Sequence, residues 1–136
     1  GPNSGGFPVT RGYHQLTHHG KVDSYIKELS IIERFHTKQF GLFLDKLTAI
    51  KEPNGKNLLD NTMALLGSGM GNASSHSNKN LPLLLAGGGF KHGNHMRFEP
   101  GNTPASNLFL SMLQRFGLDT DTFNRSSGTL TGLETV

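Results

Sequence analysis

The chain has 136 residues, a length that suits one domain and is short for two. Its 13 Lys and Arg against 10 Asp and Glu give a charge of +3 with no basic run, so nucleic acid is not an expected partner. The absence of cysteine excludes disulfides, thiolate metal ligands and a cysteine nucleophile. No apolar run approaches the roughly 20 residues of a membrane helix, so no membrane association is expected. If the chain binds a metal, its seven histidines must supply most of the ligands.

The chain begins with a segment that carries no structural pattern. We expect residues 1–12 to be a disordered or tag-derived lead, and residues 13–136 to fold. A histidine-rich segment at 13–20 opens the folded part. Residues 23–50 then show apolar side chains at helical spacing, which predicts one long amphipathic helix. The residues on its apolar face are Tyr25, Leu29, Ile32, His36, Phe40, Phe43, Leu47 and Ile50.

Two short apolar runs, at about 62–67 and 81–86, are predicted to be strands. Neither run alternates with polar residues, so both strands are expected to be covered on both faces, as in a parallel α/β sheet. Thr103 and Pro104 resemble the start of a second helix, at about 104–116, which Gly117 would end.

This set of elements predicts an α/β fold that is incomplete. Two helices cannot cover both faces of two fully buried strands. Either the chain forms a homo-oligomer, or it is the C-terminal portion of a larger α/β domain whose N-terminal remainder supplies the other strands. We favour the second interpretation.

His14 and His18 form the strongest candidate site. In a helix or a turn, the spacing i, i+4 places both imidazoles on one side, within reach of one metal ion. His19 and Thr17 are expected beside this pair, against a substrate or supporting a ligand. A loop histidine pair that binds nothing is the alternative interpretation.

His76 lies between the two apolar runs and is the third candidate. Loops that follow the carboxyl ends of parallel strands are where sites are built in α/β sheets, so His76 is expected to fold over the strand end. A solvated loop histidine is the alternative. His36 is expected in the core or at an interface, and His92 and His95 in a solvated loop.

The glycine-rich segment that follows the first strand does not match a nucleotide-binding loop. Asn72 stands where the third glycine of a dinucleotide fingerprint belongs, and no helix starts after it. We therefore expect this loop to turn sharply above the strand, over the site. Its residues are Gly67, Ser68, Gly69, Met70 and Gly71.

The segment His14-Gln15-Leu16-Thr17-His18-His19 closely resembles the H-x-x-S-H-H signature of DUF1552, a bacterial family of unknown function, with Thr17 in place of Ser. The segments 59–62, 67–71, 81–89 and 103–108 also resemble the C-terminal region of that family. The resemblance runs from about residue 12 to residue 130. It implies an exported protein, periplasmic or extracellular, with an N-terminal portion outside this chain.

The layout is more distantly similar to the C-terminal part of the alkaline phosphatase, sulfatase and phosphoglycerate mutase superfamily. Those proteins carry Asp-x-x-x-His before a long helix, then Asp-His-Gly after a buried strand, then a His six residues before a Pro. His14-x-x-x-His18 has the first spacing, with His in place of Asp, and His76 lies six residues before Pro82. The segment 69–71, Gly-Met-Gly, aligns with Asp-His-Gly, so the ligands of the second metal are missing.

This similarity implies an alkaline-phosphatase-like α/β domain with one metal, held by His14, His18 and His76. Three imidazoles suit a divalent transition metal, Zn²⁺ first, better than Mg²⁺ or Ca²⁺. The expected function is that of a single-metal hydrolase-like domain. The alternative is a catalytically degenerate binding or assembly module with the same fold. The residues leave open whether the chain is an enzyme.

Overall fold

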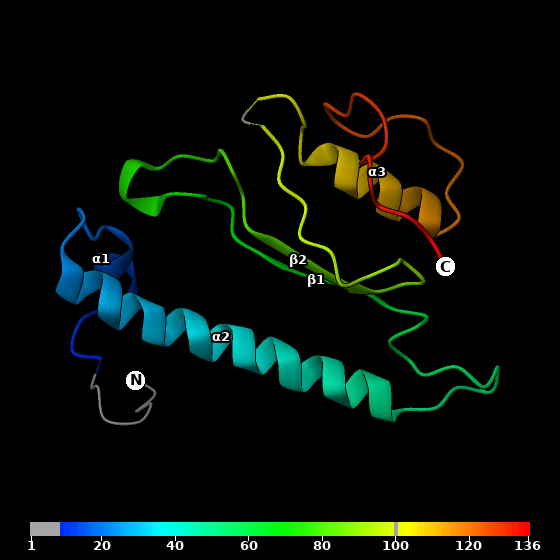
Figure 1. Cartoon of the computed structure of the whole chain (residues 1–136), viewed down its shortest axis with the longest axis horizontal. Coiled ribbons are helices and arrows are strands. Elements are labelled where there is room, and N and C mark those ends of the chain that lie inside the picture. Colours follow the sequence, from blue (N-terminus) through cyan, green and yellow to red (C-terminus); the bar gives the residue numbers. More distant parts are fainter. Residues whose placement is uncertain (1–8, 100) are drawn as a thin grey trace.

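A computed structural model describes residues 9–99 and 101–136, so most of the predicted lead lies outside the described residues. The described part contains, in chain order, α1 (Tyr13–Thr17), α2 (Asp23–Ala49), β1 (Met63–Gly67), the 3₁₀ helix η1 (Ala73–Ser75), β2 (Leu83–Gly87) and α3 (Ser106–Arg115). The prediction of a mixed helix-and-strand fold is confirmed. In Figure 1 the β1–β2 pair runs between α2 and α3, and α1 lies at the N-terminal end of α2.

The two strands form an antiparallel hairpin, which corrects the expectation of a parallel sheet. Met63 pairs with Gly87, Leu65 with Leu85 and Gly67 with Leu83. A parallel pair needs a crossover connection, usually a helix, that returns the chain to the starting edge. Residues 68–82, which join the strands, contain only the three-residue η1. The chain therefore turns back on itself.

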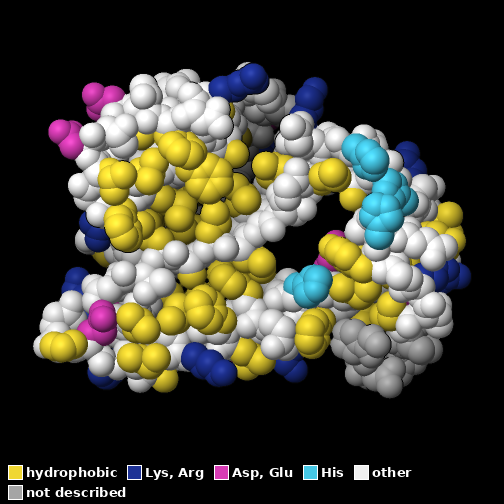
Figure 2. All heavy atoms as spheres, turned by 180° about the vertical axis from the view of Figure 1, so that it is seen from behind, with side chains coloured by type: hydrophobic (Ala, Val, Ile, Leu, Met, Phe, Trp, Pro, Cys, Tyr) yellow, Lys and Arg dark blue, Asp and Glu magenta, His cyan; other side chains and the backbone are white. Residues whose placement is uncertain are grey.

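The buried core of the described residues is small and dispersed. It contains Leu16, Ile32, Leu47, Ala64, Phe90, Leu108 and Leu110. The expectation that both faces of the strands are covered is wrong, because Leu84 in β2 is 50% exposed. His36, expected in the core or at an interface, is exposed on α2. Seen from the opposite side, apolar side chains form broad surface patches (Figure 2).

The segment after α3 is held to that helix by side-chain hydrogen bonds. Asn107 is buried, and its side-chain oxygen accepts from the Ser127 backbone N–H at 3.0 Å. The Ser111 hydroxyl accepts from the backbone N–H of Leu130 at 2.8 Å. Just after α3, Gly117 has a φ of 96°, the left-handed conformation with which a glycine commonly ends a helix, so its predicted role as the helix stop is confirmed.

The start of α3 differs from its prediction. The helix begins at Ser106, two residues after the predicted start, and its N-cap residue Ala105 makes no side-chain capping bond. Thr103 is therefore not the N-cap. Within the described ranges, no helix combines the length and the hydropathy needed to cross a membrane.

Candidate metal centre

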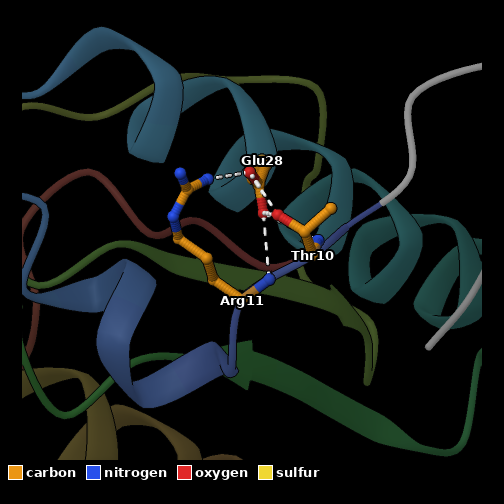
Figure 3. Close-up of polar contacts among 3 residues, drawn as sticks. All are labelled: Thr10, Arg11 and Glu28. Atoms are coloured by element: carbon orange, nitrogen blue, oxygen red, sulfur yellow. Dashed lines mark hydrogen bonds and ion pairs between the residues drawn. The ribbon is translucent and has the colours of Figure 1, made fainter.

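Helix α1 has five residues, too few to be stable by itself, and depends on its contacts with α2. Leu16 is fully buried and anchors the helix. The residues just before α1 are held by Glu28 of α2 (Figure 3). Its carboxylate accepts the backbone N–H groups of Thr10 at 2.9 Å and Arg11 at 3.2 Å, and it pairs with the Arg11 guanidinium.

These contacts change the acidity of Glu28. The hydrogen bond from the Thr10 backbone N–H is the main cause that holds the pKa of Glu28 below its ordinary value. Desolvation opposes the shift, while the Thr10 hydroxyl and the backbone and charge of Arg11 add to it. Glu28 is therefore ionised over a wide pH range and keeps the entry into α1 in place.

His14 and His18 lie one turn apart, as their spacing predicts. His14 is in α1, and His18 is the residue that ends the helix. Their ring centroids are 4.8 Å apart, with the planes inclined by 68°. The Thr17 hydroxyl donates to the His14 carbonyl at 2.8 Å, so Thr17 supports the last turn of the helix. Both imidazoles therefore lie on the same side of α1.

His76 is presented by a loop that is closed by its own hydrogen bonds. The Asn72 side chain caps η1 by accepting the Ser75 backbone N–H at 3.3 Å. The backbone N–H of His76 donates to the Ala73 carbonyl at 3.1 Å, and His76 has the left-handed φ of 51°. A non-glycine residue in this conformation is uncommon and costs conformational energy, so the loop must hold it there.

The two parts meet at His18 and His76. Their ring centroids are 4.8 Å apart, and their Nε2 atoms stand 3.3 Å apart across 58 residues of sequence. In this hydrogen bond one Nε2 carries the N–H donor and the other accepts, and the tautomers of the two rings decide which. Two nitrogens bound to one tetrahedral Zn²⁺ at about 2.0–2.1 Å stand about 3.3–3.4 Å apart. The pair therefore already has the separation of two zinc ligands.

His18 stands in the middle of the three rings, and its ring contacts those of His14 and His76. In the part of the chain that the structure describes, no group of three or more His, Asp or Glu side chains stands ready to hold a metal ion. At least one ring must therefore turn before three nitrogens converge on one ion. Figure 2 shows histidines gathered at one side of the molecule, beside an opening.

The other residues predicted near the site are His19 and the glycine-rich loop 67–71. His19 is half-buried, and its Nδ1 accepts the backbone N–H of Lys21 at 3.0 Å, which fixes the turn after His18. The glycine-rich loop 67–71 leads from β1 into the η1 turn. A Cβ atom at Gly71 would overlap the backbone oxygens of Lys79 and Asn80, so this residue must be glycine for the turn to close.

The described contacts of the remaining histidines do not involve His14, His18 or His76. His36 touches Tyr13 edge-on, with centroids 5.8 Å apart. His92 lies in an exposed loop as predicted, and its Nε2 is 2.8 Å from the Gly87 carbonyl oxygen. His95 is exposed in the same loop.

Comparison of the chain with models of known protein families, with curated proteins and with solved structures finds no match. The resemblance to DUF1552 and the similarity to the alkaline phosphatase superfamily therefore stay predictions. The geometry of the histidine cluster is the independent observation on which a function can be argued.

Proposed function

We propose that the chain binds one divalent transition metal, with Zn²⁺ as the preferred ion, through His14, His18 and His76. The observation that carries this proposal is the 3.3 Å separation of the His18 and His76 Nε2 atoms. The donor set also fits, because neutral imidazole nitrogens suit Zn²⁺, and His14 is within ring contact of His18.

The same residues support a hydrolase-like role. His14 and His76 are exposed and His18 is half-buried, so a fourth position would face solvent and a substrate. A Zn²⁺ ion with three histidine ligands and an open position lowers the pKa of a bound water to about 7. The protein's own task is to present three neutral imidazoles, while the η1 turn keeps His76 opposite α1.

We place the chain, as part of this proposal, in the C-terminal portion of an alkaline-phosphatase-like domain of an exported bacterial protein. The order of elements supports it: a histidine pair, a long helix, a strand, a glycine-rich loop, a histidine and a second strand. The support comes from this order and from the motif resemblance, and not from the direction of the strands.

Metal analysis of the purified chain tests the proposal. After loading with Zn²⁺ and removal of excess metal, the wild type is expected to retain one Zn²⁺ per chain. His14→Ala, His18→Ala and His76→Ala should each lose it, while the exposed control His95→Ala should retain it. Circular dichroism checks that the variants fold. Equal zinc content in all five proteins would contradict a site built from these three histidines.

An assembly module of the same fold is the second candidate, and an open apolar hollow favours it. The hollow has a volume of about 240 Å³ and is lined by Met63, Phe109, Met112, Leu113, Phe116 and Phe123. Phe116 is 76% exposed. Exposed apolar patches of this kind mark interaction surfaces in soluble proteins.

Assays with generic phosphate and sulfate esters, with Zn²⁺ or Mn²⁺ added, separate the two candidates. Hydrolysis that is lost in His18→Ala supports the hydrolase-like domain. A zinc-loaded chain that hydrolyses neither class of ester and binds a partner tightly supports the assembly module.

A further inference from the structure

The proposed metal site joins two segments that are far apart in the sequence, 12–22 and 71–77. Among residues 9–99 and 101–136, two side-chain hydrogen bonds link these segments. One is the contact between His18 and His76. In the other, the Gly20 backbone N–H donates to the Ser74 hydroxyl oxygen at 3.2 Å. This second bond involves neither proposed ligand, so it is available to set the distance between the two halves.

The backbone turn at residues 19–22 directs the Gly20 N–H toward Ser74. Gly20 and Lys21 follow one another in the left-handed region, with φ of 53° and 66°. The Lys21 N–H donates to His19 Nδ1, and the Val22 N–H donates to the His19 carbonyl at 2.8 Å. The N–H groups of Lys21 and Val22 are thus satisfied within the turn, while the Gly20 N–H faces Ser74.

The η1 turn holds Ser74 in place. It is the middle residue of η1, is half-buried and precedes His76 by two residues. The Asn72 cap and the bond from the His76 N–H to the Ala73 carbonyl close the turn around it. The hydroxyl of Ser74 and the imidazole of His76 therefore belong to one compact unit, and fixing the first limits the position of the second.

We infer that Ser74 is a positioning residue of the proposed metal site. Its bond to Gly20 holds η1 against the end of α1, and thereby holds His76 within reach of His18. This inference rests on the proposed function, and Ser74 is not one of the proposed ligands. The loss of one hydrogen bond of this kind is expected to weaken Zn²⁺ binding by about 5-fold.

The test compares Ser74→Ala with two matched variants. Ser74→Thr keeps the hydroxyl and should bind as the wild type does. Ser75→Ala makes the same deletion at the next residue of η1, whose exposed side chain has no described hydrogen bond. Zn²⁺ affinity is measured by competition with a chromophoric chelator. The visible absorption of the Co²⁺-loaded chain reports the ligand geometry, which a merely structural role would not change.

We expect Ser74→Ala to raise the Kd for Zn²⁺ and to alter the Co²⁺ spectrum, with the thermal midpoint of the metal-free chain nearly unchanged. Ser75→Ala and Ser74→Thr should match the wild type in all three measurements. A wild type that binds no Zn²⁺ overturns the proposed function and this inference together. A wild type that binds Zn²⁺, with Ser74→Ala equal to it in affinity and spectrum, overturns only the role of Ser74. Equal weakening in Ser75→Ala also overturns it.

Discussion

Gly71 lies where the glycine-rich loop enters the turn that carries His76. An alanine Cβ at this position would overlap backbone oxygens of Lys79 and Asn80, and backbone cannot move aside as a flexible side chain can. Gly69, two residues earlier in the same loop, has open space around its would-be Cβ. The two glycines look equivalent in the sequence and differ sharply in the structure.

Gly71→Ala is therefore expected to destabilise the chain by about 1–3 kcal/mol, the usual cost of forcing extra atoms into an occupied space. It should also reduce zinc retention, because the η1 turn would shift. Gly69→Ala should stay within about 0.5 kcal/mol of the wild type. Urea unfolding and metal analysis of both variants check this. Similar effects at the two positions would contradict the role given to Gly71.

Residue spacing predicted part of the candidate site. The i, i+4 spacing places His14 and His18 on one side of α1, and the structure brings His76 to them, although metal binding itself stays a prediction. Ser74 was not singled out, since its partner Gly20 is 54 residues away and no local pattern shows such a bond. Asn72 had a local signal, because Asn three residues before a turn's N–H is a typical cap.

At the scale of elements, α2 and the segment before α1 are joined through Glu28. Its pKa is lower in the folded chain than in the unfolded chain, so its contribution to stability is complete above the ordinary value of 4.5. As the pH falls through the lower folded value, the carboxylate is protonated and the contribution disappears. The bond is thus an acid-sensitive anchor for α1.

Glu28→Gln is expected to lower the free energy of unfolding at neutral pH, and its difference from the wild type should shrink in acid. Urea unfolding of both proteins at neutral pH and below the ordinary carboxyl pKa measures this difference. Glu33→Gln, exposed on the same helix, is the matched control and should show no comparable loss. A Glu28→Gln deficit that persists unchanged in acid would show that the carboxylate charge is not what holds the anchor.

Element positions followed from sequence patterns, and strand direction did not. The observed bounds of α2, β1, β2 and α3 lie within two residues of the predicted ones, because apolar runs and turn residues mark where elements begin and end. A run of leucines has the same pattern in parallel and antiparallel pairs. Direction was decidable only from the connection 68–82, which has no helical pattern.

At the scale of the whole molecule, the described residues leave much apolar surface open. The apolar face of α2 buries Ile32 and Leu47, while Phe43 on the helix and Ile50, which follows its last residue, remain about half exposed. The hollow beside α3 is open as well. The number of predicted helices was already too small to cover both faces of the two strands. Homo-oligomerisation and a larger α/β domain, the favoured interpretation, were the two explanations.

The isolated chain is accordingly expected to self-associate, because apolar patches left in water favour burial against a second copy. Sedimentation velocity over a range of concentrations should give a mass that rises above the 14.8 kDa of one chain. Phe116→Ser, which removes the most exposed side chain lining the hollow, should shift the distribution toward monomer with little effect on stability, since that side chain is 76% exposed.

Val136→Ser serves as the matched control. It removes an apolar side chain that is 85% exposed and does not line the hollow, so the mass distribution should stay that of the wild type. A wild type that stays monomeric at every concentration would exclude self-association as the cover, and would favour a remainder of the polypeptide in that place. Equal shifts in both variants would indicate nonspecific hydrophobic association instead of association through the hollow beside α3.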